Sequence, residues 1–299
     1  MSGALGILLA VAAAACFGIG LPLQARRARV LPDLGTAPRR AALAFLRDAR
    51  WVAASCLVLA GWGLELSALA RAPVALVFPT AAAGVAAVGV LCARWFGERL
   101  SRGDWAGVVA MMVGVASAAA SASGDTPSPD RVSVVGLATV TAGLLVLGAS
   151  GLLLGGRGRT RELIPSGASG LLYAGSGLLT KALGVAMGVS AGFAAEAGLL
   201  ALLALFAAGG AFGLQVALQR GRATVAAAWS TAISSLVPGL LAGPVFGEEW
   251  PSGARGAARA GSVVALAIGF LLLRGAASRE AEGIAPVAGA GPSGVRTSR

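Results

Sequence analysis

Few ionisable side chains lie within the long apolar stretches of this chain, and each of them is a candidate for chemistry. Glu65 and Lys181 are two such residues, and Lys181 is the only lysine among 299 residues. Because an ionisable group in hydrocarbon is costly, it usually marks a transport pathway or pairs with an opposite charge. We expect Glu65 and Lys181 to lie at similar depth near the outer ends of their helices, where they could form an ion pair.

A short acidic signature occurs twice in the chain. FGERL at 96–100 returns as FGEEW at 246–250. Each copy follows an apolar run, so we expect both to close helices at the membrane surface. The residues of this repeat signature are Gly97, Glu98, Gly247 and Glu248.

Two glutamines are the counterparts of Glu65 and Lys181. At the same offset of 150 residues, Glu65 corresponds to Gln215. At an offset of 157 residues, FGIGLPLQ, which ends at Gln24, corresponds to AGSGLLTK, which ends at Lys181. We predict that Glu65, Lys181, Gln24 and Gln215 line a central substrate pathway. The alternative is structural, with one buried ion pair and two glutamines that bond neighbouring helices.

The composition indicates that these side chains lie in helices that span a membrane. Hydrophobic residues make up 57% of the chain and charged residues 12%, whereas about a quarter of a soluble domain is charged. Apolar stretches of about 20 residues, enough to cross ~30 Å of hydrocarbon, recur along the sequence. We expect nine membrane-spanning helices, near residues 4–23, 51–70, 73–93, 104–123, 132–154, 167–188, 196–218, 223–246 and 256–273.

These spans divide the chain into two unequal halves. Residues 1–124 hold four spans and a basic loop at 24–50, and residues 132–274 hold five. Five spans separate the two signatures, so the signatures lie on opposite sides of the membrane. The sequence therefore predicts an all-α polytopic membrane protein built from two inverted repeats, an architecture typical of secondary transporters. Residues 275–299, rich in Ala, Gly, Pro and Ser, are expected to form a disordered cytoplasmic tail.

Arginines gather in alternate connections between the spans. Placing those connections in the cytoplasm satisfies the positive-inside rule, and it puts the N-terminus outside and the C-terminus inside. The net charge of +11 is then explained by helix orientation and contact with anionic headgroups of the bilayer, so we expect no nucleic-acid partner. Residues 32–50 carry too many arginines for an ordinary span, and either an interfacial helix or a degenerate tenth span fits them.

Prolines interrupt two of the expected spans. Proline removes a ladder hydrogen bond and leaves a carbonyl free, and broken helices at matching positions of two repeats point to a transport site. These helix-break candidates are Pro73 and Pro79 in the first half, and Pro238 and Pro244 in the second.

Enzymatic function finds little support in the residue types. The chain has no histidine and no HExxH metal motif, and acid–base chemistry would depend on Glu65 and Lys181 alone. We predict no enzyme, no catalytic residue and no cofactor. A structural or lipid-handling membrane subunit without transport activity is the remaining alternative class.

Several stretches resemble a known family. FGERLSRGDWAGVVAMMVGV resembles the end of an EamA-like half in the drug/metabolite transporter superfamily, and FGEEW with the helix after it resembles a second copy. Within that superfamily the chain is most similar to the NIPA-type magnesium transporters. The likeness lies in WVAASCLVLAGWGLELSALARAPVALVFPTAAAGVAAV and in GSGLLTKALGVAMG.

The resemblance implies a transporter of the plasma membrane in which the two halves expose a central site alternately to either side. It implies Mg²⁺ or another small cation as substrate. Mg²⁺ prefers oxygen ligands, of which Glu65 supplies one carboxylate and Glu196 is the candidate for a second; further metal ligands are unknown. Because the Lys181 ammonium would repel a dication, export of a small organic metabolite or drug is the alternative. A homodimer is left open.

Overall fold

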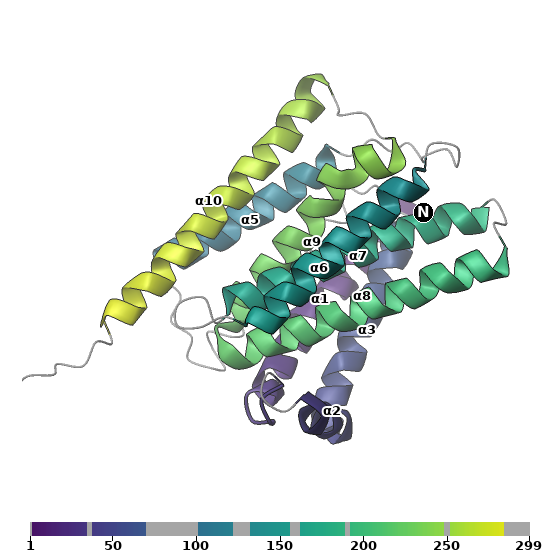
Figure 1. Ribbon diagram of the computed structural model, residues 1–299. Helices are drawn as coiled ribbons and strands as arrows, with labels where there is room; N and C mark the ends of the chain where they lie inside the picture. Colours follow the sequence, from purple (N-terminus) through teal and green to yellow (C-terminus); the bar gives the residue numbers. More distant parts are fainter. Residues whose placement is uncertain are drawn as a thin grey trace, which may run out of the picture.

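The computed structural model describes residues 2–34, 38–69, 101–121, 132–155, 162–188, 192–247 and 252–283. Every regular element in these ranges is an α-helix, which confirms the expected all-helical class (Figure 1). The helices are α1 (Ser2–Ala28), α2 (Pro38–Arg47), α3 (Ala49–Leu69), α5 (Arg102–Ala120), α6 (Val134–Leu154), α7 (Leu163–Gly188), α8 (Phe193–Arg220), α9 (Ala223–Phe246) and α10 (Gly253–Gly283).

Four of the described helices are long and apolar enough to cross a membrane. The apolar segments are Leu8–Ala28, Val134–Leu154, Leu163–Met187 and Phe193–Arg220. A shorter apolar segment, Ala223–Pro238, lies in α9. The expected count of nine spans is therefore not confirmed, and the span expected at 73–93 lies outside the described residues.

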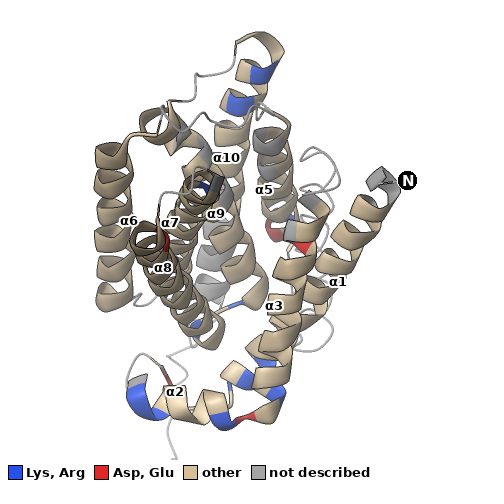
Figure 2. Cartoon of the chain, turned by 90° about the vertical axis from the view of Figure 1, so that its right-hand side faces the viewer, with Lys and Arg blue, Asp and Glu red and all other residues tan. Residues whose placement is uncertain are grey.

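Large apolar side chains cover much of the outer surface of these helices. Val135 is 77% exposed and Leu153 87% exposed on α6, and Phe193 is 88% exposed at the start of α8. Figure 2 shows that most residues along the helices are uncharged. Contiguous apolar surface of this kind is rare on soluble monomers and matches lipid chains. The molecule is a multi-pass membrane protein.

The helices pack in pairs and around a central helix. α1 runs beside α3, α5 runs beside α10, and α7 contacts α6, α8 and α9 (Figure 1). Small residues let these helices approach closely. A Cβ atom added at Gly20 of α1 would lie 2.7 Å from Val58 Cγ2 of α3, and one at Gly175 of α7 would lie 2.2 Å from Phe206 Cε1 of α8.

The short helix α2 lies in the basic loop at 24–50. With 10 residues it is about 15 Å long, half of what a membrane span requires. Its Ala41 and Phe45 are buried against Ala28, Leu34 and Val216. The degenerate tenth span is therefore excluded for this segment, and α2 is a short amphipathic helix.

The last helix extends further than the sequence suggested. We expected residues 275–299 to be a disordered tail, but α10 continues to Gly283. The segment AASREAEG at 276–283 is rich in Ala, Glu and Arg, which have high helix propensity, and this accounts for the continuation. The rest of the tail lies outside the described residues.

Candidate functional site

Two of the four predicted pathway residues touch each other. Gln215 of α8 donates a hydrogen bond from its Nε2 to Oε1 of Gln24 on α1, at 3.0 Å. Both side chains lie in the interior, each in a residue 6% exposed. A buried amide costs free energy unless it is hydrogen-bonded, so this contact ties α1 to α8.

Two residues of α3 extend the glutamine pair into a ring of hydrogen bonds. Trp51 Nε1 donates to Gln215 Oε1 at 3.3 Å, and Gln24 Nε2 donates to Ser55 Oγ at 2.9 Å. Trp51 and Ser55 are one helical turn apart, so the ring begins and ends on α3. Each amide oxygen receives a donor and each amide nitrogen finds an acceptor. We call Gln24, Gln215, Trp51 and Ser55 the glutamine ring.

The other two predicted pathway residues, Glu65 and Lys181, lie on α3 and α7. Glu65 is half-buried on α3. The Lys181 ammonium lies 4.5 Å from the centroid of the Phe246 ring, a cation–π contact between α7 and α9. Ion pairs between described residues include those at Arg27, Arg220 and Arg222. A pairing of Glu65 with Lys181 stays a prediction.

The remaining predicted residues are spread over the second half. Glu196 stands in the first turn of α8. Pro238 and Pro244 lie inside α9, and Gly247 caps that helix in the left-handed conformation, with φ 64° and its N–H bonded to Gly243 O. Glycine adopts this φ without the strain that a Cβ would bring.

Part of the predicted set cannot be compared with the structure. These residues lie outside the described ranges: Pro73, Pro79, Gly97, Glu98 and Glu248.

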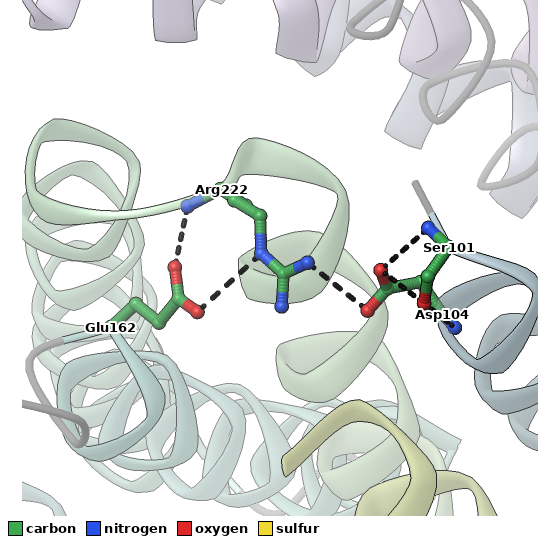
Figure 3. Close-up of polar contacts among 4 residues, drawn as sticks. All are labelled: Ser101, Asp104, Glu162 and Arg222. Atoms are coloured by element: carbon green, nitrogen blue, oxygen red, sulfur yellow. Dashed lines mark hydrogen bonds and ion pairs between the residues drawn. The ribbon is translucent and has the colours of Figure 1, made fainter. Parts of the chain in front are cut away.

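A second polar network, missed in the sequence, is centred on Arg222 (Figure 3). Arg222 Nη1 lies 3.0 Å from Asp104 Oδ1, and Arg222 Nε lies 3.9 Å from Glu162 Oε1. Glu162 Oε2 also accepts the backbone N–H of Arg222. Asp104 is fully buried. We call Arg222, Asp104, Glu162 and Ser101 the arginine bridge.

Ser101 completes this network, and it belongs to a helix-capping pattern that can be recognised in the sequence. Its N–H and hydroxyl donate to Asp104 Oδ2 at 2.9 and 3.0 Å, and its Oγ accepts the Asp104 N–H at 3.1 Å. Ser101-Arg-Gly-Asp104 is a reciprocal cap of the type Ser-x-x-acid before an apolar run. The capping pattern predicts the start of α5, but it does not indicate the arginine that binds the acid.

Both networks lie at the end of the molecule where α2 is found. There α1 and α8 finish, and α3, α5, α7 and α9 begin. Further bonds join the connections at this end: Arg29 Nη2 donates to Gly221 O at 2.9 Å, and Gln219 Nε2 donates to Ala28 O at 2.9 Å. We refer to it as the α2 end.

The glutamine ring and the arginine bridge differ in what they can bind. The ring offers neutral amide oxygens, and the bridge holds two carboxylates that face a guanidinium. No group of three or more His, Cys, Asp or Glu able to hold a metal ion occurs in the parts of the chain that the structure describes. The described geometry thus joins helices and presents oxygen atoms without a preformed carboxylate cage.

Comparison with known families agrees with the pattern read from the sequence. The family model described as "Magnesium transporter NIPA" matches residues 2–146. Residues 2–146 are NIPA-like. The resemblance stated from the sequence is confirmed over this stretch, and with the apolar helices it supports a membrane transporter. No curated protein and no solved structure matches the chain.

Both networks connect the NIPA-like stretch to the rest of the chain. In the glutamine ring, Gln24 lies inside the stretch and Gln215 outside it. In the arginine bridge, Asp104 lies inside, while Arg222 and Glu162 lie outside. Side chains that sequence comparison assigns to different parts of the chain are therefore bonded to each other at the α2 end.

Proposed function

We propose that this protein is a secondary transporter of the plasma membrane that carries Mg²⁺ or another small cation by alternating access of two inverted halves. Gln24, Gln215, Glu65 and Lys181 line the pathway. The N-terminus lies outside and the C-terminus in the cytoplasm, so the α2 end faces the cytoplasm.

The hydrogen bond between Gln24 and Gln215 is the observation that carries this proposal. The sequence predicts both residues for the pathway as repeat counterparts of Lys181 and Glu65, in different halves of the chain. They meet in the interior, 3.0 Å apart. Polar side chains that line a pathway must converge from several helices, and the ring at Gln24 and Gln215 draws on α1, α3 and α8.

Packing within each half supports the inverted repeat. A Cβ added at Gly61 of α3 would lie 3.0 Å from Cys16 Cβ of α1, and one at Gly210 of α8 would lie 2.8 Å from Tyr173 Cδ1 of α7. Tyr173 lies 157 residues after Cys16, and Gly210 lies 149 residues after Gly61. The pairs α1 with α3 and α7 with α8 thus use near-equivalent contacts.

The residue chemistry suits a cation that keeps part of its water. Mg²⁺ gives up its hydration shell reluctantly and is usually bound by one or two carboxylates and several waters. Amide oxygens of Gln24 and Gln215 can accept hydrogen bonds from such waters once the ring opens. The Glu65 carboxylate would supply the negative charge that such a cation requires.

Mg²⁺ flux into proteoliposomes that contain an entrapped indicator tests the proposal. Wild-type protein is expected to give saturable flux. Glu65→Gln removes the one pathway carboxylate and is expected to reduce flux at least tenfold, while Lys181→Met is expected to preserve it. Asp33→Asn serves as a charge-matched control, because Asp33 lies in an exposed, 3.6 Å ion pair with Arg220, where pairs contribute little.

The outcomes separate the two substrate classes. If folded wild-type protein gives no flux above empty liposomes, the cation proposal fails. The ammonium of Lys181, near the end of α9, then favours an anionic organic solute, and thermal stabilisation by candidate solutes is the next measurement. A structural subunit would show neither flux nor stabilisation.

A further inference from the structure

The helix α2 presents a charged and apolar surface away from the rest of the molecule. It lies across the shared end of α1 and α3, and Lys and Arg gather there in Figure 2. α1 and α3 run side by side through the membrane region. A helix that connects them at one end lies at the level of the lipid headgroups.

One face of α2 is fixed to the protein. Ala41 is fully buried and Phe45 is 3% exposed, and both pack on Ala28, Leu34 and Val216. The Phe45 ring also meets the Trp51 ring edge to face, with centroids 5.1 Å apart. This anchoring sets which residues of α2 face outward.

The opposite face combines arginines with leucines. Arg39, Arg40 and Arg47 are exposed, and Leu43 and Leu46 are 54% and 66% exposed. The helix contains no acidic residue. Asp48, which follows α2 in the chain, pairs with Arg27.

We propose that this face of α2 binds the headgroups of anionic phospholipids in the adjacent leaflet. Guanidinium groups form bidentate hydrogen bonds with phosphate, and two exposed leucines beside them match the boundary between headgroups and acyl chains. An acidic protein or a nucleic acid would use the arginines but not the leucines. The combination of charge and apolar surface selects lipid.

This surface is continuous with the glutamine ring. Phe45 touches Trp51, and Trp51 donates to Gln215. A lipid that holds α2 in place therefore also holds the donor that orients the Gln215 amide. The anionic lipid acts as a positioning ligand for the α2 end.

Hydrogen exchange of the full-length protein in nanodiscs tests the proposal. Discs of phosphatidylcholine alone are compared with discs that also contain phosphatidylglycerol, and protection of backbone amides is measured over 38–47. Anionic lipid is expected to raise protection in the wild type, by about fivefold for each arginine that meets a headgroup. High salt should reduce this gain, because it screens exposed charges.

The variants make the test specific to α2. Arg39→Gln, Arg40→Gln and Arg47→Gln together should remove the gain, whereas Arg26→Gln, Arg102→Gln and Arg255→Gln, which remove equal charge at exposed positions elsewhere, should keep it. Protection of the amides over 49–69 reports whether a variant is folded. If the triple variant does not fold, Arg40→Gln alone is the test, and its α2 amides should lose about fivefold of the protection gained from anionic lipid.

Two results would overturn the proposal. One is equal protection of α2 in both kinds of disc, and the other is a gain that survives in the folded triple variant. Neither readout requires transport, so the outcome is independent of the proposed function.

Discussion

Arg222 is the side chain on which the α2 end depends most at the level of single residues. It lies 3.0 Å from the fully buried Asp104 and binds Glu162 through its side chain and its backbone N–H. Asp104 keeps two bonds from Ser101, but those bonds cannot replace a positive charge. A buried carboxylate without its cation is strongly destabilising.

We therefore expect Arg222→Met to lower the free energy of unfolding by about 3 kcal/mol. Chemical denaturation in detergent micelles measures this change. Adding Asp104→Asn should recover part of the loss, because it removes the fully buried carboxylate that lost its cation, while Glu162 can keep its bond to the backbone N–H of residue 222. Arg220→Met is the matched control, since Arg220 pairs at 3.6 Å with a side chain that is 42% exposed and should cost less than ~1 kcal/mol. Equal losses at positions 220 and 222 would contradict the account.

Gly221 is required because the arginine bridge leaves no space for a side chain. A Cβ atom there would lie 1.9 Å from Glu162 Oε2 and 2.2 Å from Glu162 Cβ. Gly221→Ala must displace Glu162 from the Arg222 N–H, so we expect a lower melting temperature and a loss of roughly 1–3 kcal/mol. Gly143→Ala provides the comparison, because nothing lies within 4 Å of the added atom and alanine favours a helix interior. A neutral Gly221→Ala would argue against the close contact.

Asp48 controls the junction between two elements, α2 and α3. Its carboxylate binds the Arg27 guanidinium and accepts the N–H of Trp51 at 2.8 Å, which makes Asp48 the N-cap of α3. The hydrogen bond from Arg27, followed by the backbone bond from Trp51, lowers the pKa of Asp48 below its ordinary value. The same cap holds Trp51 in position for the glutamine ring.

A lowered pKa in the folded state has a definite sign in the pH dependence of stability. The contribution of Asp48 is fully present above its unfolded pKa of about 3.9 and is lost as pH falls through the lower folded pKa. The wild type should therefore melt above Asp48→Asn at neutral pH, and the gap between their melting temperatures should close below about pH 4. A gap that persists at acidic pH would assign the effect to packing and not to charge.

The helical elements were readily predicted from the sequence, but their partners were not. Apolar runs bounded by charges or by Gly and Pro gave helix positions close to those of α6, α7, α8 and α9, because burial in lipid makes the local pattern decisive. Gln24 and Gln215 were predicted as pathway residues because they correspond to Lys181 and Glu65 in the repeat. That they bond each other could not be deduced, since the contact depends on how α1 packs against α8.

The contacts that the sequence did not predict lie mainly at charged residues near helix ends. In the sequence, Arg222 and Glu162 look like solvated charges that orient helices at a membrane surface. Whether such a charge is solvated or buried is decided by the tertiary packing of α5, α7 and α9, on which a linear pattern gives no information. For a related reason, the sequence did not decide whether residues 32–50 form an interfacial helix or a degenerate tenth span. The answer depends on whether the Phe45 side chain packs into the core, which tertiary structure determines.

At the scale of the whole molecule, the α2 end is closed by bonds that cross from the NIPA-like stretch to the rest of the chain. The glutamine ring joins α1 and α3 to α8, and the arginine bridge joins α5 to the starts of α7 and α9. In a transporter that works by alternating access, one side is closed while the other is open. The bonds at the α2 end must then break once in every cycle.

A cleavable cross-link between positions 24 and 215 tests this requirement. In a background with Cys16, Cys56 and Cys92 replaced by alanine, Gln24→Cys and Gln215→Cys are joined by a short thiol reagent that reductant can cleave. Flux in proteoliposomes should fall to the level of empty liposomes after cross-linking and return after cleavage. Ala28→Cys with Gln219→Cys, about one turn further along both helices, provides a second pair if loss of the glutamines alone abolishes flux.

A cross-link within the second half distinguishes loss of motion from general damage. Gly148 of α6 faces Leu172 of α7, where an added Cβ would lie 2.7 Å from Leu172 Cγ. Gly148→Cys joined to Leu172→Cys ties two helices that move together when halves move as units, so flux should persist. Full flux through protein locked between positions 24 and 215 would mean that the α2 end need not open, and transport would then require a route that leaves α1 and α8 in contact. Loss of flux only with the lock at 24 and 215 would identify the separation of α1 from α8 as an obligatory step.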